Sequence, residues 1–170
     1  MTTRAGGEHS TRSTSPVPAI LAAGGAAGLL DILAAFATTI AKGRRPVGVL
    51  KAIASGLLGP DAFSRGNGVA ALGLFLHFVI ATGWAAIYWL LTRRFPVLLR
   101  RPVPAGALYG IAVFWLMRLV VVPLSAAPDF SNGGVADVVR GMAIHVVCVG
   151  LPIALVVARA ARAPVRAAAP

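Results

Sequence analysis

The chain has 170 residues, of which 58% are hydrophobic and 12% are charged. Soluble domains carry about 25% charged residues, so this composition excludes an ordinary soluble fold and indicates a membrane protein. The excess of 16 Lys and Arg over 5 Asp and Glu does not indicate nucleic-acid binding, because these basic residues gather at the ends of apolar runs. Cys148 is the only cysteine, which excludes an intrachain disulfide and a cysteine-based zinc site.

The first apolar run covers residues 18–40 and follows a Ser- and Thr-rich segment, residues 1–17, that we expect to be a disordered cytoplasmic tail. The run is long enough for a helix that crosses a bilayer. It contains Gly24 and Gly28, whose spacing allows a second helix to come close, and one carboxylate, Asp31. The alternative, a cleaved signal peptide, requires a shorter apolar stretch without an acidic residue.

A basic connection over residues 41–68 contains a second apolar segment, residues 46–58. Its periodicity places Leu50, Ile53, Ala54 and Leu57 on one helical face, and Lys51 and Ser55 on another. Thirteen residues of helix rise only about 20 Å, which is too short to span a bilayer. We therefore predict an amphipathic helix in the plane of the membrane surface, with a fifth crossing as the alternative.

Three further runs of membrane-spanning length follow, at residues 69–92, 104–124 and 135–158. Each contains one ionisable residue at a similar depth, apart from Asp137 and Arg140 at the start of the last run, and at least one glycine that we expect to pack against another helix. The ionisable residues are His77, Arg118 and His145, and the glycines are Gly73, Gly106, Gly110 and Gly141. Trp84, Tyr88 and Trp89 gather near the end of the second run, where amphipathic rings favour the head-group region. Pro152 is predicted to kink the fourth run.

These elements predict an all-α protein. We expect an integral membrane bundle of four transmembrane helices over residues 18–158, with the in-plane amphipathic helix between the first and second, and a basic Ala- and Pro-rich tail over residues 159–170. With four crossings, one side holds both termini and nine basic residues: Arg4, Arg12, Arg93, Arg94, Arg100, Arg101, Arg159, Arg162 and Arg166. The other side holds Lys42, Arg44, Arg45, Lys51, Arg65 and Arg140. The positive-inside rule therefore predicts that the protein lies in the cell inner membrane with both termini in the cytoplasm.

Three segments carry a family resemblance: IASGLLGPDAF from Ile53, LHFVIATGWAAIYW from Leu76 and VVVPLSAAP from Val120. Together they resemble a family of small bacterial four-helix inner-membrane proteins that has no assigned activity. The likeness covers residues 19–158 and implies the same membrane fold, but it names no substrate or catalytic residue. In that family an Asn often stands at the position of Arg118, so the resemblance does not imply a mechanism that requires a cation there.

The four ionisable residues Asp31, His77, Arg118 and His145 fall at similar depths in the four runs. Counted from the same side at about 1.5 Å per residue, all four lie roughly 9–15 Å deep. Such groups are expected to face the bundle interior and to find partners there. The simplest arrangement is an Asp31–Arg118 ion pair with the two histidines beside it, and this polar cluster would then hold the four helices in register.

Three further functions use the same residues. A small transporter or channel would use Asp31, His77 and His145 as titratable positions for a proton or solute. A b-type haem protein would ligate iron through His77 and His145, although we expect no cofactor. An intramembrane enzyme acting on lipid would need a nucleophile, and only Ser125 and Thr82 qualify by elimination, so an enzyme is the less favoured class.

The expected partners follow from the membrane setting. The lipid bilayer surrounds the bundle, and the basic loops are suited to anionic phospholipid head groups. The alternative to an autonomous function is an accessory role, as a homo-oligomer or as one subunit of a larger membrane complex.

Overall fold

The computed structural model describes residues 15–128 and 133–162, and these residues form helices and connecting turns without any strand. The all-α prediction is therefore confirmed for this part of the chain. Most of the predicted tails, residues 1–14 and 163–170, lie outside the described residues.

Four helices in the described ranges are long and apolar enough to cross a membrane. The first two are α1 (Val17–Ala41) and α3 (Gly68–Arg94). The third runs without a break from Pro102 to Leu124 through α5 (Pro102–Leu116), the π-helical turn η2 (Met117–Val121) and α6 (Val122–Leu124). The fourth combines α7 (Val135–Ile144), the π-helical turn η3 (His145–Gly150) and α8 (Leu151–Arg162). The four membrane-crossing helices that the apolar runs predicted are thus present.

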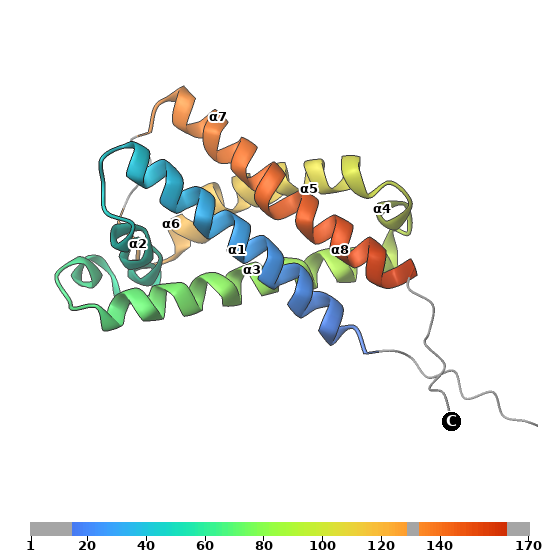
Figure 1. Cartoon of the computed structure of the whole chain (residues 1–170), viewed down its shortest axis with the longest axis horizontal. Helices are drawn as coiled ribbons and strands as arrows, with labels where there is room; N and C mark the ends of the chain where they lie inside the picture. The colour runs from blue at the N-terminus through green and yellow to red at the C-terminus, as the bar shows by residue number, and fades with distance from the viewer. Residues whose placement is uncertain (1–14, 129–132, 163–170) are drawn as a thin grey trace, which may run out of the picture.

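The helices form one elongated bundle (Figure 1). Helix α1 packs against α3 on one side and against η3 and α8 on the other, while α5 packs against η3 and α8. The start of α1, the end of α8 and the short helix α4 (Val97–Arg100) lie at one end of the bundle. The opposite end contains α2 (Val47–Leu58), α6 and the start of α7.

Glycines set the closest helix approaches. A Cβ atom built on Gly24 would lie 2.5 Å from the Cα of Thr82, and one on Gly28 would lie 2.8 Å from the Phe78 ring, so α1 and α3 meet where α1 has no side chain. Where α5 meets η3, a Cβ on Gly110 would lie 2.6 Å from the carbonyl oxygen of His145. The remaining predicted packing glycines also face neighbours: Gly73 faces the Leu50 carbonyl, Gly106 faces the Gly150 carbonyl and Gly141 faces the Phe114 ring.

Helix α2 is the predicted surface helix. Its 12 residues rise about 18 Å, too short to cross a bilayer. Figure 1 shows it crosswise to the long axis of the bundle, and it packs on α3. The predicted faces are partly wrong: Ser55 is fully buried and Leu57 is 64% exposed. The backbone N–H of Ala126 donates to the carbonyl of Gly56, so the segment after α6 also contacts α2, and helical periodicity could not foresee that second contact.

The aromatic residues near the end of α3 differ from the prediction in one respect. Tyr88 is only 1% exposed and belongs to the core instead of a head-group belt. Its ring packs edge-on against Tyr109 of α5, whose hydroxyl donates to the carbonyl of Trp84 at 2.6 Å. These aromatic contacts join α3 to α5 at the end of the bundle that holds the termini.

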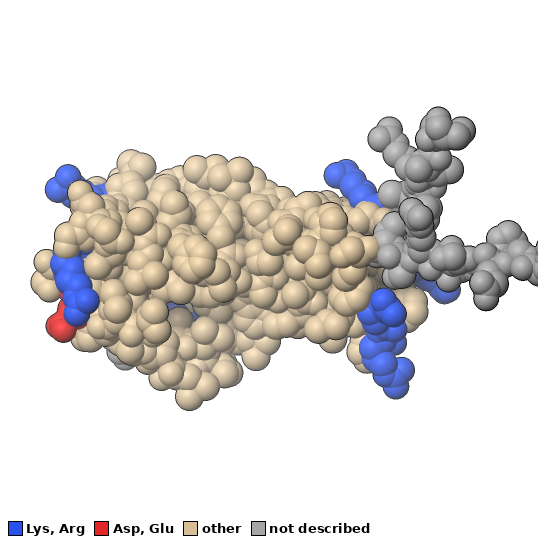
Figure 2. All heavy atoms as spheres, turned by 90° about the horizontal axis from the view of Figure 1, so that it is seen from below, with Lys and Arg blue, Asp and Glu red and all other residues tan. Residues whose placement is uncertain are grey.

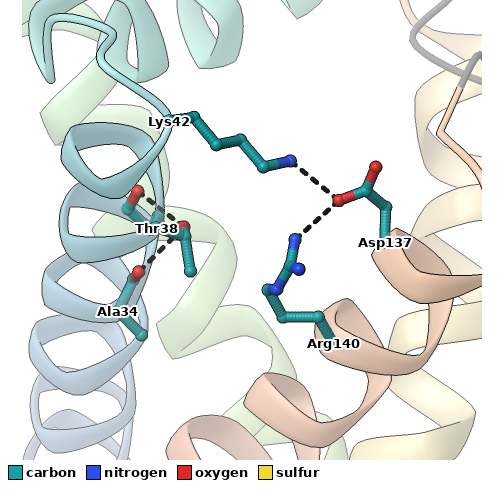
Figure 3. Close-up of polar contacts among 6 residues, drawn as sticks. Ala34, Thr38, Lys42, Asp137 and Arg140 are labelled. Carbon is teal, nitrogen blue, oxygen red and sulfur yellow. Dashed lines mark hydrogen bonds and ion pairs between the residues drawn. The ribbon is translucent and has the colours of Figure 1, made fainter.

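Charged side chains gather at the two ends of the molecule, and the face in Figure 2 is uncharged between them. At the end near α2, the Asp137 carboxylate accepts hydrogen bonds of 2.7 Å from both Lys42 and Arg140 (Figure 3). This group joins the end of α1 to the start of α7. At the same end, Lys51 donates to the carbonyls of Phe63 and Arg65 and so ties α2 to the turn η1 (Pro60–Phe63) and the residues after it.

Candidate binding cavity

A cavity of about 1090 Å³ lies between the helices and is lined by residues from α1, α2, α3, α5, both π-helical turns and α6. All four ionisable residues predicted from the apolar runs, Asp31, His77, Arg118 and His145, line this one cavity. Each of the four is half-buried. Four crossings thus each contribute one ionisable side chain to the same space.

His77 links two helices through its ring. Its Nε2 atom lies 2.8 Å from the carbonyl oxygen of Gly28 on α1, and a carbonyl can only accept, so Nε2 donates. In the neutral ring, Nδ1 is then left as an acceptor. Gly28 lies three residues before Asp31 on α1. The bond to Gly28 therefore places the His77 ring within one helical turn of Asp31.

His145 is held by its own helix. Its Nδ1 atom donates to the carbonyl of Gly141 at 2.9 Å, which leaves Nε2 as the acceptor of the neutral ring. The ring packs edge-on against Phe114 of α5, with 5.4 Å between ring centroids. Arg118 lies four residues after Phe114 on the third crossing. Arg118 and His145, which belongs to the fourth crossing, therefore share one side of the cavity.

Both of these residues lie in π-helical turns, since Arg118 belongs to η2 and His145 begins η3. Each turn ends two residues before a proline, Pro123 or Pro152. A proline has no N–H and its ring crowds the carbonyl four residues earlier, and a widened turn relieves that conflict. The fourth crossing continues as one helix past Pro152, where a kink was predicted, with the π turn η3 directly before it. Such turns are frequent at functional sites.

The predicted ion pair between Asp31 and Arg118 is not formed. In residues 15–128 and 133–162, the ion pairs within 4.0 Å are Lys42–Asp137 and Arg140–Asp137. Arg118 has an interaction of its own within the protein. Over the same residues Asp31 makes neither a hydrogen bond nor an ion pair, although it lines the cavity. Counting along the chain predicts similar depths for these side chains but not their lateral separation across the cavity, which is why the predicted ion pair was wrong.

The rest of the cavity wall is largely apolar. Helix α2 contributes Val49 and Ile53, α3 contributes Ile80 and Trp84, and α6 contributes Val122. Pockets that bind small molecules combine an apolar wall with a few placed polar groups, and they range from about 300 to 1,000 Å³. The cavity has this composition and lies at the upper end of that size range.

The haem alternative requires a free nitrogen on each histidine ring, directed at a common metal. The Nε2 atom of His77 is bonded to the Gly28 carbonyl and the Nδ1 atom of His145 to the Gly141 carbonyl, so Nδ1 of His77 and Nε2 of His145 are the nitrogens left for iron. Haem binding therefore stays a prediction. In the described part of the chain, no group of three or more His, Cys, Asp or Glu side chains could hold a metal ion.

The two nucleophile candidates also lack a catalytic arrangement. The hydroxyl of Ser125 donates to the carbonyl of Val122 at 2.7 Å and accepts from the N–H of Ala127, so it caps the end of α6. Thr82 lies at the close contact with Gly24 in the α1–α3 interface. Neither hydroxyl is hydrogen-bonded to a side chain that could act as a base.

Sequence reasoning missed two contributors to the site. Gly150, in η3, faces the backbone of Gly106 and Gly110, and this contact lets the fourth crossing approach α5 beside His145. The π turns themselves were also missed, and the signal available for them was a proline a few residues after each ionisable residue.

Comparisons with known proteins do not extend this description: no protein-family model matches the chain, and no curated protein or solved structure shows a significant match.

Proposed function

We propose that this protein binds a small solute in the cavity between its four crossings, as a solute- or proton-handling protein of the bacterial inner membrane. The observation that carries the proposal is the position of Asp31, a carboxylate that lines a largely apolar cavity and has no partner in the described residues. An ionisable group without a partner at membrane depth is costly, and such groups mark substrate and proton pathways.

The competing role is structural, with the four polar groups holding the helices in register. That role predicts polar contacts from helix to helix. His77 makes one such contact, with Gly28, but His145 bonds to its own helix and Asp31 contributes none in the described part of the chain. The glycine contacts and the Lys42–Asp137–Arg140 group supply the inter-helix packing instead. We therefore infer that Asp31 and His145, unlike His77, serve something other than inter-helix packing.

The proposed topology places both termini in the cytoplasm. The end of the bundle near the termini contains Arg93, Arg94, Arg100, Arg101, Arg159 and Arg162. At the opposite end, Lys42 and Arg140 share the Asp137 carboxylate and Lys51 is bonded to two backbone carbonyls. The arginines near the termini are therefore better placed for anionic lipid at the cytoplasmic surface.

Water access to the cavity tests the proposal. We would replace Cys148 by alanine and introduce a single cysteine at Ala35, which lines the cavity, or at Leu33, which is 52% exposed on the outer side of the same helix. The two positions differ in depth by about 3 Å. We expect a membrane-impermeant cationic methanethiosulfonate reagent to modify Ala35→Cys and to leave Leu33→Cys unmodified in intact membranes. Equal protection of both positions would show a dry interior and would contradict a solute-binding role.

A further inference from the structure

Three of the four ionisable residues that line the cavity, Asp31, His77 and His145, offer hydrogen-bond acceptors. From this we infer that the ligand is an organic cation, with an apolar body and a hydrogen-bond-donating head such as a primary ammonium group. The inference rests on the proposed binding role and adds the chemical class of the ligand.

Three of the lining residues, each from a different crossing, offer acceptor atoms. The Asp31 carboxylate can only accept hydrogen bonds. His77 donates through Nε2 to Gly28, and His145 donates through Nδ1 to Gly141, so each ring, when neutral, keeps one acceptor nitrogen. The two backbone carbonyls therefore determine which nitrogen of each neutral ring is left to accept from a ligand.

The charges of the cavity also favour a cationic ligand. Asp31 contributes a negative charge without a protein partner in the described residues, whereas the guanidinium of Arg118 already has an interaction within the protein. An ammonium group would offset the carboxylate charge and donate up to three hydrogen bonds. A carboxylate ligand would instead be repelled by Asp31 and could not accept from the two imidazole lone pairs, which leaves Arg118 as the ionisable lining residue able to donate to it.

The apolar wall fits the body of such a ligand. Aliphatic side chains of α1, α2, α3, α6 and the two π-helical turns line most of the cavity, and Trp84 and Phe114 add aromatic rings. Aromatic faces attract cations within about 6 Å, and burial of the apolar body supplies the larger part of the binding energy. A small hydrophilic cation would leave this wall unfilled.

Three compounds that share one apolar body and differ in the head group test the inference: 4-phenylbutylamine, 4-phenyl-1-butanol and 4-phenylbutyrate. Binding to the purified full-length protein in mild detergent is measured by equilibrium dialysis, with empty micelles as the blank. We expect the amine to bind about tenfold more tightly than the alcohol, because its hydrogen bonds to Asp31 are charge-assisted. The carboxylate is expected to bind least.

The Asp31→Asn variant supplies the matched control. We expect it to bind the amine about tenfold more weakly and to lose much less affinity for the alcohol, whose hydrogen bond is not an ion pair, and retained binding of the alcohol also shows that the cavity is folded. Asp31→Glu should retain the preference for the amine.

The possible failures are distinguishable. Binding of the alcohol or the carboxylate as tight as that of the amine would overturn the cationic class and leave the solute-binding role in place. An amine preference that survives in Asp31→Asn would overturn the role of Asp31. Absence of binding by all three compounds would overturn the inference, and protection of Ala35→Cys from the aqueous reagent would overturn the binding role as well.

Discussion

The ring of His77 on α3 donates a hydrogen bond of 2.8 Å to the backbone carbonyl of Gly28 on α1. A Cβ atom on Gly28 would lie 2.8 Å from the Phe78 ring, the neighbour of His77 in sequence. The absence of a side chain at Gly28 therefore lets α3 come close enough for the bond. One small residue thus determines both the helix packing and the tautomer of a cavity-lining histidine.

Loss of this inter-helix bond should lower stability moderately. Hydrogen bonds between membrane helices contribute on average about 0.6 kcal/mol, so we expect His77→Phe to lower the free energy of unfolding by about that amount, because the Gly28 carbonyl keeps its hydrogen bond within α1. His77→Gln can still donate and should lose less. Unfolding in mixed detergent micelles measures both variants, and a His77→Phe variant as stable as the wild type would contradict the role of the bond.

The contact between α5 and η3 should be intolerant of side chains. In Gly150→Ala the new methyl group would overlap the backbone of Gly106 and Gly110, so we expect a loss of 2 kcal/mol or more, on the order of the larger overpacking penalties. The control is Gly83→Ala in α3, where nothing lies within 4 Å of the added Cβ atom. That substitution should stabilise the helix by about 0.5–1 kcal/mol. Similar melting temperatures for the two variants would refute the close approach.

The attachment of α2 should depend on Lys51. In Lys51→Met the hydrogen bonds to the carbonyls of Phe63 and Arg65 are lost, so the segment after η1 should open more often. We expect faster trypsin cleavage after Arg65, measured by mass spectrometry of limited digests. Lys42→Met is the control, because Lys42 bonds to Asp137 on α7 and not to this segment. Unchanged cleavage in Lys51→Met would show that packing on α3 alone holds α2.

The sequence allowed the helices to be predicted more completely than the cavity. The length and the apolar composition of each run determine whether its helix can cross a bilayer, and both can be read directly from the sequence. For this reason the predicted runs 18–40 and 69–92 lie within two residues of the observed α1 and α3 at each end. The depth of Asp31, His77, Arg118 and His145 followed from the same counting, and the structure places all four on one cavity.

The distances and contacts between neighbouring helices were harder to predict from the sequence. Whether Asp31 reaches Arg118 depends on how far apart α1 and the third crossing lie, and no local pattern encodes that separation. The contact between Gly56 of α2 and Ala126 joins segments that lie 70 residues apart in sequence. The π turns depend on how the packed bundle relieves the missing N–H and the steric crowding at each proline.

The most direct test of the account compares two identical substitutions, Asp31→Asn and Asp137→Asn. Asp137 accepts from Lys42 and Arg140, so its neutralisation removes two ion pairs and should lower the melting temperature. Asp31 has no such partner in the described residues, and its neutralisation removes a half-buried charge, so stability should rise by about 1 kcal/mol.

Thermal unfolding of both variants and the wild type in one detergent gives the answer. The account predicts a higher melting temperature for Asp31→Asn and a lower one for Asp137→Asn. A lower melting temperature for both variants would show that Asp31 holds the helices together and would contradict its assignment to a binding cavity.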